Sequence, residues 1–263
     1  EEAMQNYDKA IQLKPDFAEA YCNRGIALKQ LGRPKESIQV FDNAIQLKPD
    51  YAAAYNNRGN ALKDLWLLDE AVASYDKAIQ LKPDYAAAYS NRGNALKDLG
   101  RLEEAMQNYD KAIQLKPDLA EAQYNRHALL LNPDDLMPAI KCMEKAIDID
   151  PLNMNHRFIL GMLWDYSGDT QKATTHFDIV ESGESLYRAR LDAWRYIKSA
   201  NKKVPTIIGS NIHAFKLGIE AAVVDGLVLE FGVRFGTSIR QISTLVDQDV
   251  YGFDSFQGLP ESW

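Results

Sequence analysis

The sequence predicts a mainly α-helical protein, in which a right-handed superhelical array of helix-turn-helix repeats precedes the first part of an α/β domain. Two observations predict this fold class. Prolines recur every 34 residues through the first part of the chain, and two short apolar runs lie near its end. A period of that length is typical of a solenoid, and short apolar runs are typical of buried strands. We expect a repeat array with a C-terminal capping helix over 1–200, a linker over 201–211, and the start of the α/β domain over 212–263.

Each repeat reads as two amphipathic helices, for example residues 52–65 and 68–81. Proline ends the second helix because it cannot donate to the helical hydrogen-bond ladder. Small residues recur where helices cross, and aromatic residues recur where they fill the gaps between helices. This pattern resembles the tetratricopeptide repeat. The residues that carry it are Pro15, Pro49, Pro83, Pro117 and Pro151; Gly25, Gly59, Gly93 and Gly161; and Phe41, Tyr75, Tyr109 and Phe177.

Asparagine recurs at one position of the first helix of successive repeats. A carboxamide offers a donor and an acceptor, so it can pair with any peptide unit. The row resembles the asparagine ladder in the repeat domain of O-linked N-acetylglucosamine transferases, which implies an extended peptide or partner protein in a concave groove. The alternative is a solvated or helix-bridging polar group copied with each repeat. The asparagines are Asn23, Asn57, Asn91 and Asn125.

Charged side chains also recur on these first helices. The lysine–aspartate set favours a mixed charged surface over a carboxylate clamp, and the arginines favour contacts between repeats. The residues are Lys29, Lys63, Lys97, Asp64 and Asp98, and Arg24, Arg58, Arg92 and Arg126.

Composition argues against several functions. The net charge is −7, which disfavours nucleic acid because phosphate binding requires an excess of clustered Lys and Arg. No apolar run is long enough for a membrane span, and two unpaired cysteines suit a reducing cytoplasm. The four histidines show no metal-ligand spacing, so we interpret His127, His156, His176 and His213 as packing or surface residues and expect no metal site.

Trp66 stands at the turn between two helices, where other repeats have glycine at Gly32, Gly100 and Gly168. This change places apolar residues on a corner that is normally polar. Trp66 then either contacts another chain or folds back on its own hairpin.

Near the C-terminus, an apolar run over 227–231 precedes the glycine-containing loop 232–236. A helix over about 237–245 and a second strand over 250–253 follow, and the second strand is followed by Asp254. This order, preceded by a helix over about 212–223, matches the first unit of a doubly wound nucleotide-binding fold. Gly232 and Gly236 allow a ligand to approach the backbone, and Asp254 can accept hydrogen bonds from a ribose diol.

The segments EFGVRFGTSIRQIS and VYGFDSFQGLPESW resemble the macrocin O-methyltransferase-like branch of class I methyltransferases. The resemblance implies S-adenosylmethionine as cofactor in the complete domain. It places Glu230, Gly232 and Gly236 beside the methionine part and Asp254 at the ribose. Glu230 has the alternative role of capping the next helix, and the catalytic residues are not identified.

The favoured function is a peptide- or protein-binding scaffold attached to an S-adenosylmethionine-dependent methyltransferase, acting on an oxygen, whose catalytic domain is incomplete and therefore inactive alone. The alternative from another class is an interaction or oligomerisation scaffold without catalysis. A glycosyltransferase-linked array is a third interpretation, which depends on the asparagines alone. Because a two-stranded unit leaves both sheet edges open, the chain is expected to form a homodimer.

Overall fold

The structure is a computed structural model, and it describes residues 2–183, 187–188, 190–192, 194–195, 228–231 and 250–253. The helices of residues 1–101 and those of residues 102–209 form two compact units, each with its own packing. No helix among the described residues is long and apolar enough to cross a membrane.

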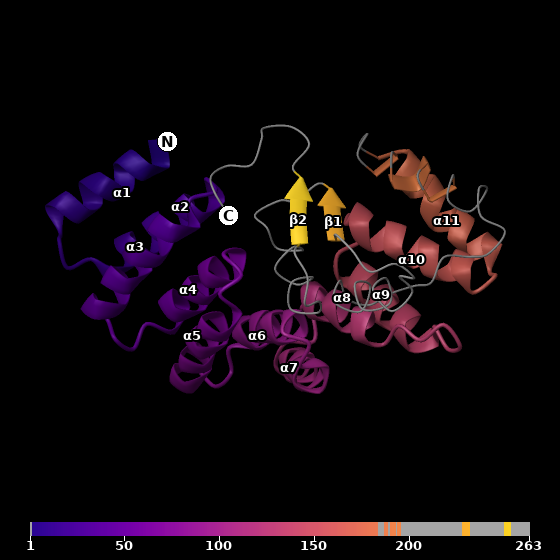
Figure 1. The fold of residues 1–263 in the computed structure, drawn as a ribbon, viewed down its shortest axis with the longest axis horizontal. Coiled ribbons are helices and arrows are strands. Elements are labelled where there is room, and N and C mark those ends of the chain that lie inside the picture. Colours follow the sequence, from indigo (N-terminus) through magenta and orange to yellow (C-terminus); the bar gives the residue numbers. More distant parts are fainter. Residues whose placement is uncertain are drawn as a thin grey trace. The chain divides into compact units, whose positions relative to one another are not determined.

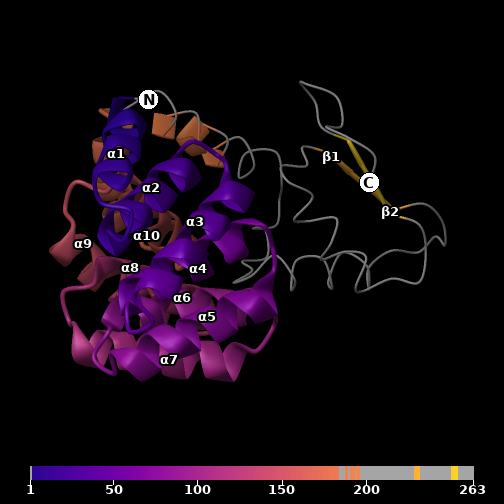
Figure 2. The same ribbon diagram turned by 90° about the vertical axis from the view of Figure 1, so that its left-hand side faces the viewer.

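The first unit is a stack of antiparallel helix hairpins, seen in Figures 1 and 2. Consecutive helices pack on each other, and α2, α4 and α6, the first helices of successive repeats, are also neighbours. The prediction of a helical repeat array is confirmed. The elements are α1 (Glu2–Leu13), α2 (Ala18–Gln30), α3 (Pro34–Leu47), α4 (Ala52–Asp64), α5 (Leu68–Leu81) and α6 (Ala86–Asp98).

Local chemistry explains where these helices begin and end. Pro34 occupies the first turn of α3, where a missing N–H costs nothing. Gly32, two residues earlier, has φ = 75°, the left-handed conformation that commonly ends a helix such as α2. Pro49 then prevents α3 from continuing.

Glycine and an aromatic residue form the tightest contact inside each hairpin. A Cβ atom on Gly59 would lie 2.5 Å from Cε1 of Tyr75, and one on Gly25 would lie 2.6 Å from Cε1 of Phe41. Both aromatic rings are fully buried. The recurring glycines therefore let the first helix pack directly on the ring from the second helix.

The recurring arginines connect each first helix to the preceding second helix. Nε of Arg24 lies 2.7 Å from the Asp8 carboxylate, and Nε of Arg58 lies 2.6 Å from that of Asp42. These pairs are partly exposed, so each contributes only about 0–1 kcal/mol and mainly fixes register. Arg92 with Asp76, and Arg126 with Asp110 in the second unit, repeat the pair. This arrangement agrees with the interpretation of the arginines as contacts between repeats.

The second unit has a larger apolar core built from α9, α10, α11 and the segment that follows them. Leu191 and Trp194, from the expected capping helix, are buried in this core, and the residues described between 187 and 195 are helical. Nε1 of Trp194 donates to the Asp165 carboxylate at 2.8 Å. The elements are α7 (Leu102–Leu115), α8 (Ala120–Leu129), α9 (Met137–Ile149), α10 (Met154–Tyr166) and α11 (Thr170–Glu181).

Two short strands lie near the C-terminus. β1 (Val228–Phe231) and β2 (Val250–Phe253) pair in parallel, with Glu230 opposite Gly252. The strands agree with the apolar runs of the sequence. The linker over 201–211 and the helices expected over 212–223 and 237–245 lie outside the described residues.

Trp66 adopts φ = 62°, and among the described residues it is the one non-glycine residue with a positive φ. Its side chain is half-buried, Leu67 is 42% exposed, and Leu68 is buried. The expected apolar corner is therefore divided, because Leu68 joins the core and Leu67 faces solvent.

Candidate functional site: a polar face on α2, α4 and α6

Three of the four recurring asparagines lie on the neighbouring helices α2, α4 and α6 of the first unit. We call Asn23, Asn57 and Asn91 the asparagine row. Asn23 is exposed, and Asn57 and Asn91 are half-buried. Asn125 belongs to α8 in the second unit, where it is buried and its amide nitrogen has no partner among the described residues. The candidate site therefore consists of the three residues of the first unit.

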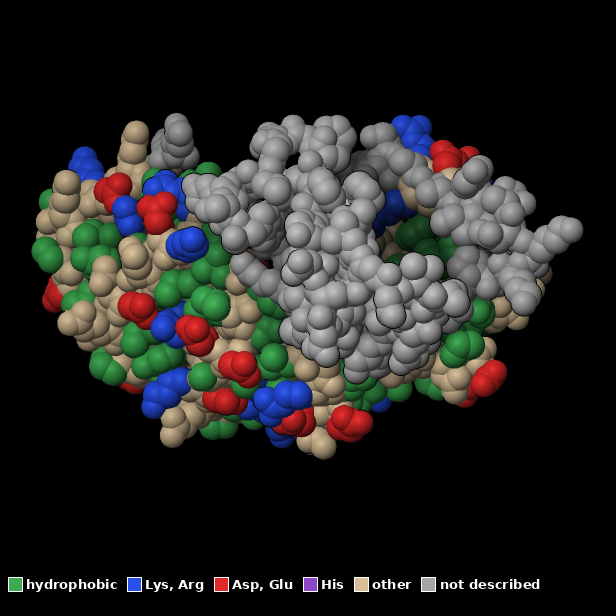
Figure 3. All heavy atoms as spheres, in the orientation of Figure 1, with side chains coloured by type: hydrophobic (Ala, Val, Ile, Leu, Met, Phe, Trp, Pro, Cys, Tyr) green, Lys and Arg blue, Asp and Glu red, His purple; other side chains and the backbone are tan. Residues whose placement is uncertain are grey.

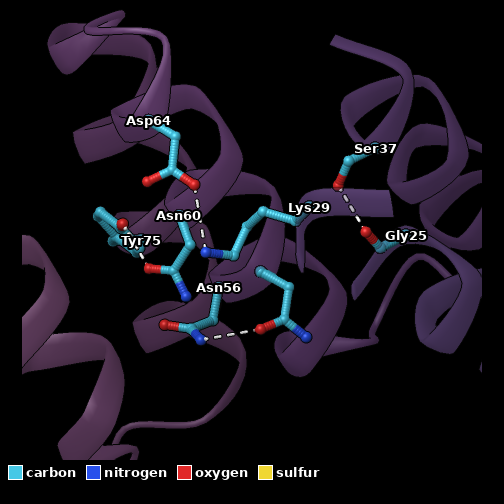
Figure 4. Close-up of polar contacts among 8 residues, drawn as sticks. Gly25, Lys29, Ser37, Asn56, Asn60, Asp64 and Tyr75 are labelled. Carbon is cyan, nitrogen blue, oxygen red and sulfur yellow. Dashed lines mark hydrogen bonds and ion pairs between the residues drawn. The ribbon is translucent and has the colours of Figure 1, made fainter. Parts of the chain in front are cut away.

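Two members of the asparagine row bridge adjacent helices. Nδ2 of Asn91 on α6 donates to Oδ1 of Asn56 on α4 at 2.9 Å. Nδ2 of Asn57 on α4 lies 3.7 Å from Sγ of Cys22 on α2. Asn56 and Asn57 are themselves connected, because Nδ2 of Asn56 lies 3.5 Å from Oδ1 of Asn57 (Figure 4). These contacts fix the side-chain orientation of Asn57 and Asn91.

Cys22 is the last residue in this set of contacts, and its thiol is buried and protonated. Burial raises the pKa of its thiol, so it is neutral at physiological pH. The neighbouring Tyr51 hydroxyl also contacts the thiol, and burial raises the pKa of Tyr51 to about 12. The site therefore holds uncharged groups around Asn57.

A second row of side chains on the same helices consists of ion pairs between repeats. Nζ of Lys29 lies 3.2 Å from the Asp64 carboxylate (Figure 4), and Nζ of Lys63 lies 3.8 Å from that of Asp98. Burial raises the pKa of Asp98, although Lys63 opposes this effect. Because Lys29 and Lys63 are each matched by an aspartate, these two pairs are locally neutral, which agrees with a mixed charged surface.

The visible surface of the first unit shows the same balance. Basic and acidic side chains are interspersed over its described part in Figure 3. The described residues also hold no group of three or more His, Cys, Asp or Glu that could bind a metal ion. The face is therefore suited to polar, hydrogen-bonded recognition rather than to binding one sign of charge.

The cofactor residues expected near the C-terminus are only partly described. Glu230 lies in β1, and Gly232, Gly236 and Asp254 lie outside the described residues. β1 and β2 pair in parallel, so the C-terminal ends of both strands lie at one edge of the sheet, where the cofactor residues were expected.

Sequence reasoning missed Cys22 and Asn56 as parts of the site. Both occupy the position directly before the asparagine row, and Ser90 occupies it on α6. All three side chains are polar or weakly polar and buried. The sequence shows a polar or weakly polar residue directly before each asparagine of the row, but only the fold shows that this position is buried.

The paired antiparallel helices with a 34-residue period define the chain as a helical repeat protein. A family model described as TPR repeat matches residues 1–32, 68–100 and 93–132. Two models described as tetratricopeptide repeat match residues 18–51 and 52–82. Together these matches run without a gap from residue 1 to residue 132, half of the 263 residues. The chain therefore belongs to the tetratricopeptide repeat (TPR) family.

Two MamA structures support the same fold. A MamA structure is 22% identical and covers 59% of this chain and 90% of its own, with a TM-score of 0.50. MamA 41-end from Desulfovibrio magneticus RS-1 is 25% identical and covers 63% and 93%, with a TM-score of 0.51. YrrB, a TPR protein with an unusual peptide-binding site, is 20% identical and covers 71% and 97%, with a TM-score of 0.49. No curated protein sequence matches the chain.

Proposed function

We propose that the polar face of α2, α4 and α6 binds an extended peptide or an extended segment of a partner protein. The observation that carries this proposal is the fixed orientation of Asn57 and Asn91, which are held by contacts to Cys22 and Asn56. Fixed polar groups lose little side-chain entropy when a ligand binds, and that preorganisation favours affinity. The alternative of a helix-bridging role is compatible with this proposal, because bridging leaves one amide N–H of each residue for a ligand.

The spacing of the row suits a peptide backbone. Packed helices lie about 8–10 Å apart, and an extended chain advances about 3.3–3.6 Å per residue. Successive asparagines would then meet about every third residue of the ligand. The neutral Lys29–Asp64 and Lys63–Asp98 pairs impose no single charge on it.

The test is a screen of acetylated and amidated heptapeptides against the complete chain, followed by the double substitution Asn57→Ala with Asn91→Ala. Each lost hydrogen bond contributes about 0.5–1.5 kcal/mol, so the double variant should bind about 5- to 150-fold more weakly. The exposed Asn43, on α3, provides the matched control Asn43→Ala, which should leave affinity unchanged. The proposal fails if no peptide binds or if the double variant binds as well as the control.

As a second function, we propose that the C-terminal segment is the start of an S-adenosylmethionine-dependent methyltransferase domain. The parallel pair of β1 and β2 supports this proposal, since a doubly wound fold begins with such a pair. In the resemblance, Glu230 and the glycines Gly232 and Gly236 surround the methionine part, and Asp254 accepts from the ribose. The cofactor would supply an electrophilic methyl group, and these residues would bind and orient it.

Calorimetry with S-adenosylmethionine on a chain carrying the complete domain tests this second function. Asp254→Ala removes a charged acceptor and should weaken cofactor binding by about 1.5–3 kcal/mol. A complete domain that binds no S-adenosylmethionine would instead favour the scaffold without catalysis. Unchanged affinity in the variant would exclude the proposed role of Asp254 alone.

A further inference from the structure

The amide side-chain contacts across α2, α4 and α6 all have their donor and acceptor in the same order. Asn91 donates to Asn56, Asn56 donates to Asn57, and Asn57 donates to the sulfur of Cys22. We call these four residues the amide chain. Its three steps measure 2.9, 3.5 and 3.7 Å, so the first step is the strongest.

The direction of the amide chain determines what it offers to a ligand. An amide that donates through its nitrogen becomes a better acceptor at its oxygen, because connected hydrogen bonds polarise one another. Asn91 is the first residue of the amide chain. No described residue donates to its Oδ1, and the side chain is half-buried rather than enclosed. The oxygen of Asn91 is therefore the strongest uncommitted acceptor of the amide chain.

We infer that the site recognises a backbone N–H of the ligand at Oδ1 of Asn91, with Asn56 as the residue that positions this oxygen. This inference rests on the proposed peptide-binding function. It defines the ligand class as peptide segments with a free amide hydrogen at the contacting residue. Proline, which lacks that hydrogen, is excluded there.

A measurement without ligand tests the positioning role of Asn56. In proton–nitrogen correlation spectra of the complete chain, one Nδ2 proton of Asn91 should resonate downfield because it is hydrogen-bonded. Asn56→Ala removes the acceptor and should abolish that shift. Asn56→Asp retains an acceptor oxygen and should preserve it, whereas Asn43→Ala should change nothing. An Asn91 resonance that is the same in wild type and Asn56→Ala would overturn the amide chain.

A second measurement tests recognition of the N–H. The tightest heptapeptide from the screen is resynthesised with each amide N–H replaced in turn by an ester oxygen, which removes the donor without adding bulk. One replacement should weaken binding to the wild-type chain by about 2- to 13-fold, the value of one hydrogen bond. The same replacement should have no effect on binding to Asn91→Ala.

Asn56→Ala should weaken the parent peptide to a similar extent, and Asn56→Asp should recover most of the affinity. Equal loss in wild type and Asn91→Ala at every position would overturn the inference but leave peptide binding intact. Failure of every heptapeptide to bind the wild-type chain would instead remove the proposed function, and this inference with it.

Discussion

Trp66 occupies a backbone conformation that glycine holds elsewhere in the array. Its φ of 62° resembles the 75° and 77° of Gly32 and Gly100, which stand at the same position of neighbouring repeats. A side chain in the left-handed region costs about 1–2 kcal/mol, because Cβ approaches the following carbonyl oxygen. The repeat architecture therefore imposes this conformation on a residue that does not favour it.

This strain gives a prediction about residue 66. Trp66→Gly should be more stable than Trp66→Ala by about 1 kcal/mol, because both lose the indole and only glycine relieves the strain. The exposed Ala73, inside α5, provides the control, since Ala73→Gly should be destabilising by about 1 kcal/mol. Urea unfolding of the variants checks the sign. A Trp66→Ala protein that equals or exceeds Trp66→Gly in stability would contradict the strain.

The asparagines of the candidate site could be predicted from the sequence, but their contact partners could not. The sequence showed that Asn57 and Asn91 recur, and it indicated two possible roles for them, peptide binding and helix bridging. The structure shows that both bridge helices, and peptide binding stays a proposal. The partners Cys22 and Asn56 could not be found from the row alone. Their contact depends on the distance between helices one repeat apart, which no local pattern determines.

At the scale of helices, periodicity accounts for most of the fold. The regular spacing of proline and glycine predicted a helix over residues 68–81, and α5 has these bounds, Leu68–Leu81. The prediction succeeded because both residue types act on the backbone locally. The apolar runs near the C-terminus likewise correspond to β1 and β2. The C-terminal domain stays a prediction beyond that strand pair, because the residues that would complete it lie outside the described part.

The helices of the second unit differ from those of the first in their histidines. His156 on α10 is buried and stacks on Tyr124 with ring centroids 5.0 Å apart. Burial lowers its pKa, although Asp150 opposes this effect. Burial likewise lowers the pKa of His176 on α11, with a further contribution from Arg157. Residues 1–101 contain no histidine, so this source of acid sensitivity is absent from the helices of the first unit.

A pH dependence follows from these depressed values. The folded form holds each imidazole neutral, so its contribution to stability is fully present above the unfolded pKa of about 6.5. It is lost as the pH falls through the lower folded value, with a slope of up to about 1.4 kcal/mol per pH unit for each histidine. Helices α8–α11 should therefore lose amide-exchange protection between pH 7.5 and 5.5, while α2–α6 keep theirs.

The variant His156→Asn checks the assignment, because it should reduce the pH dependence of the second unit, leaving the part due to His176, without changing the first. Equal loss of protection in both groups of helices would show that the carboxylates, rather than the histidines, determine the acid response.

At the scale of the molecule, the strand pair predicts association. In the described part of the chain, β1 pairs only with β2, so each strand has one edge without a described neighbour. Open edges of apolar strands favour pairing with another chain. Light scattering should therefore give about twice the 29.6 kDa monomer mass. Deleting residues 204–263 should return the array to a monomer, and a monomeric complete chain would contradict the expectation.

The recurring arginine–aspartate pair also affects how the number of repeats can change during evolution. Arg58 with Asp42 and Arg92 with Asp76 make the same contact one period apart, so successive interfaces within the first unit are interchangeable. An in-frame loss of residues 52–85 would place Arg92 opposite Asp42 and Asn91 opposite Cys22, so they would take over the contacts that Arg58 and Asn57 make. Recombination between near-identical coding repeats can therefore lengthen or shorten the asparagine row by one residue without requiring a new core.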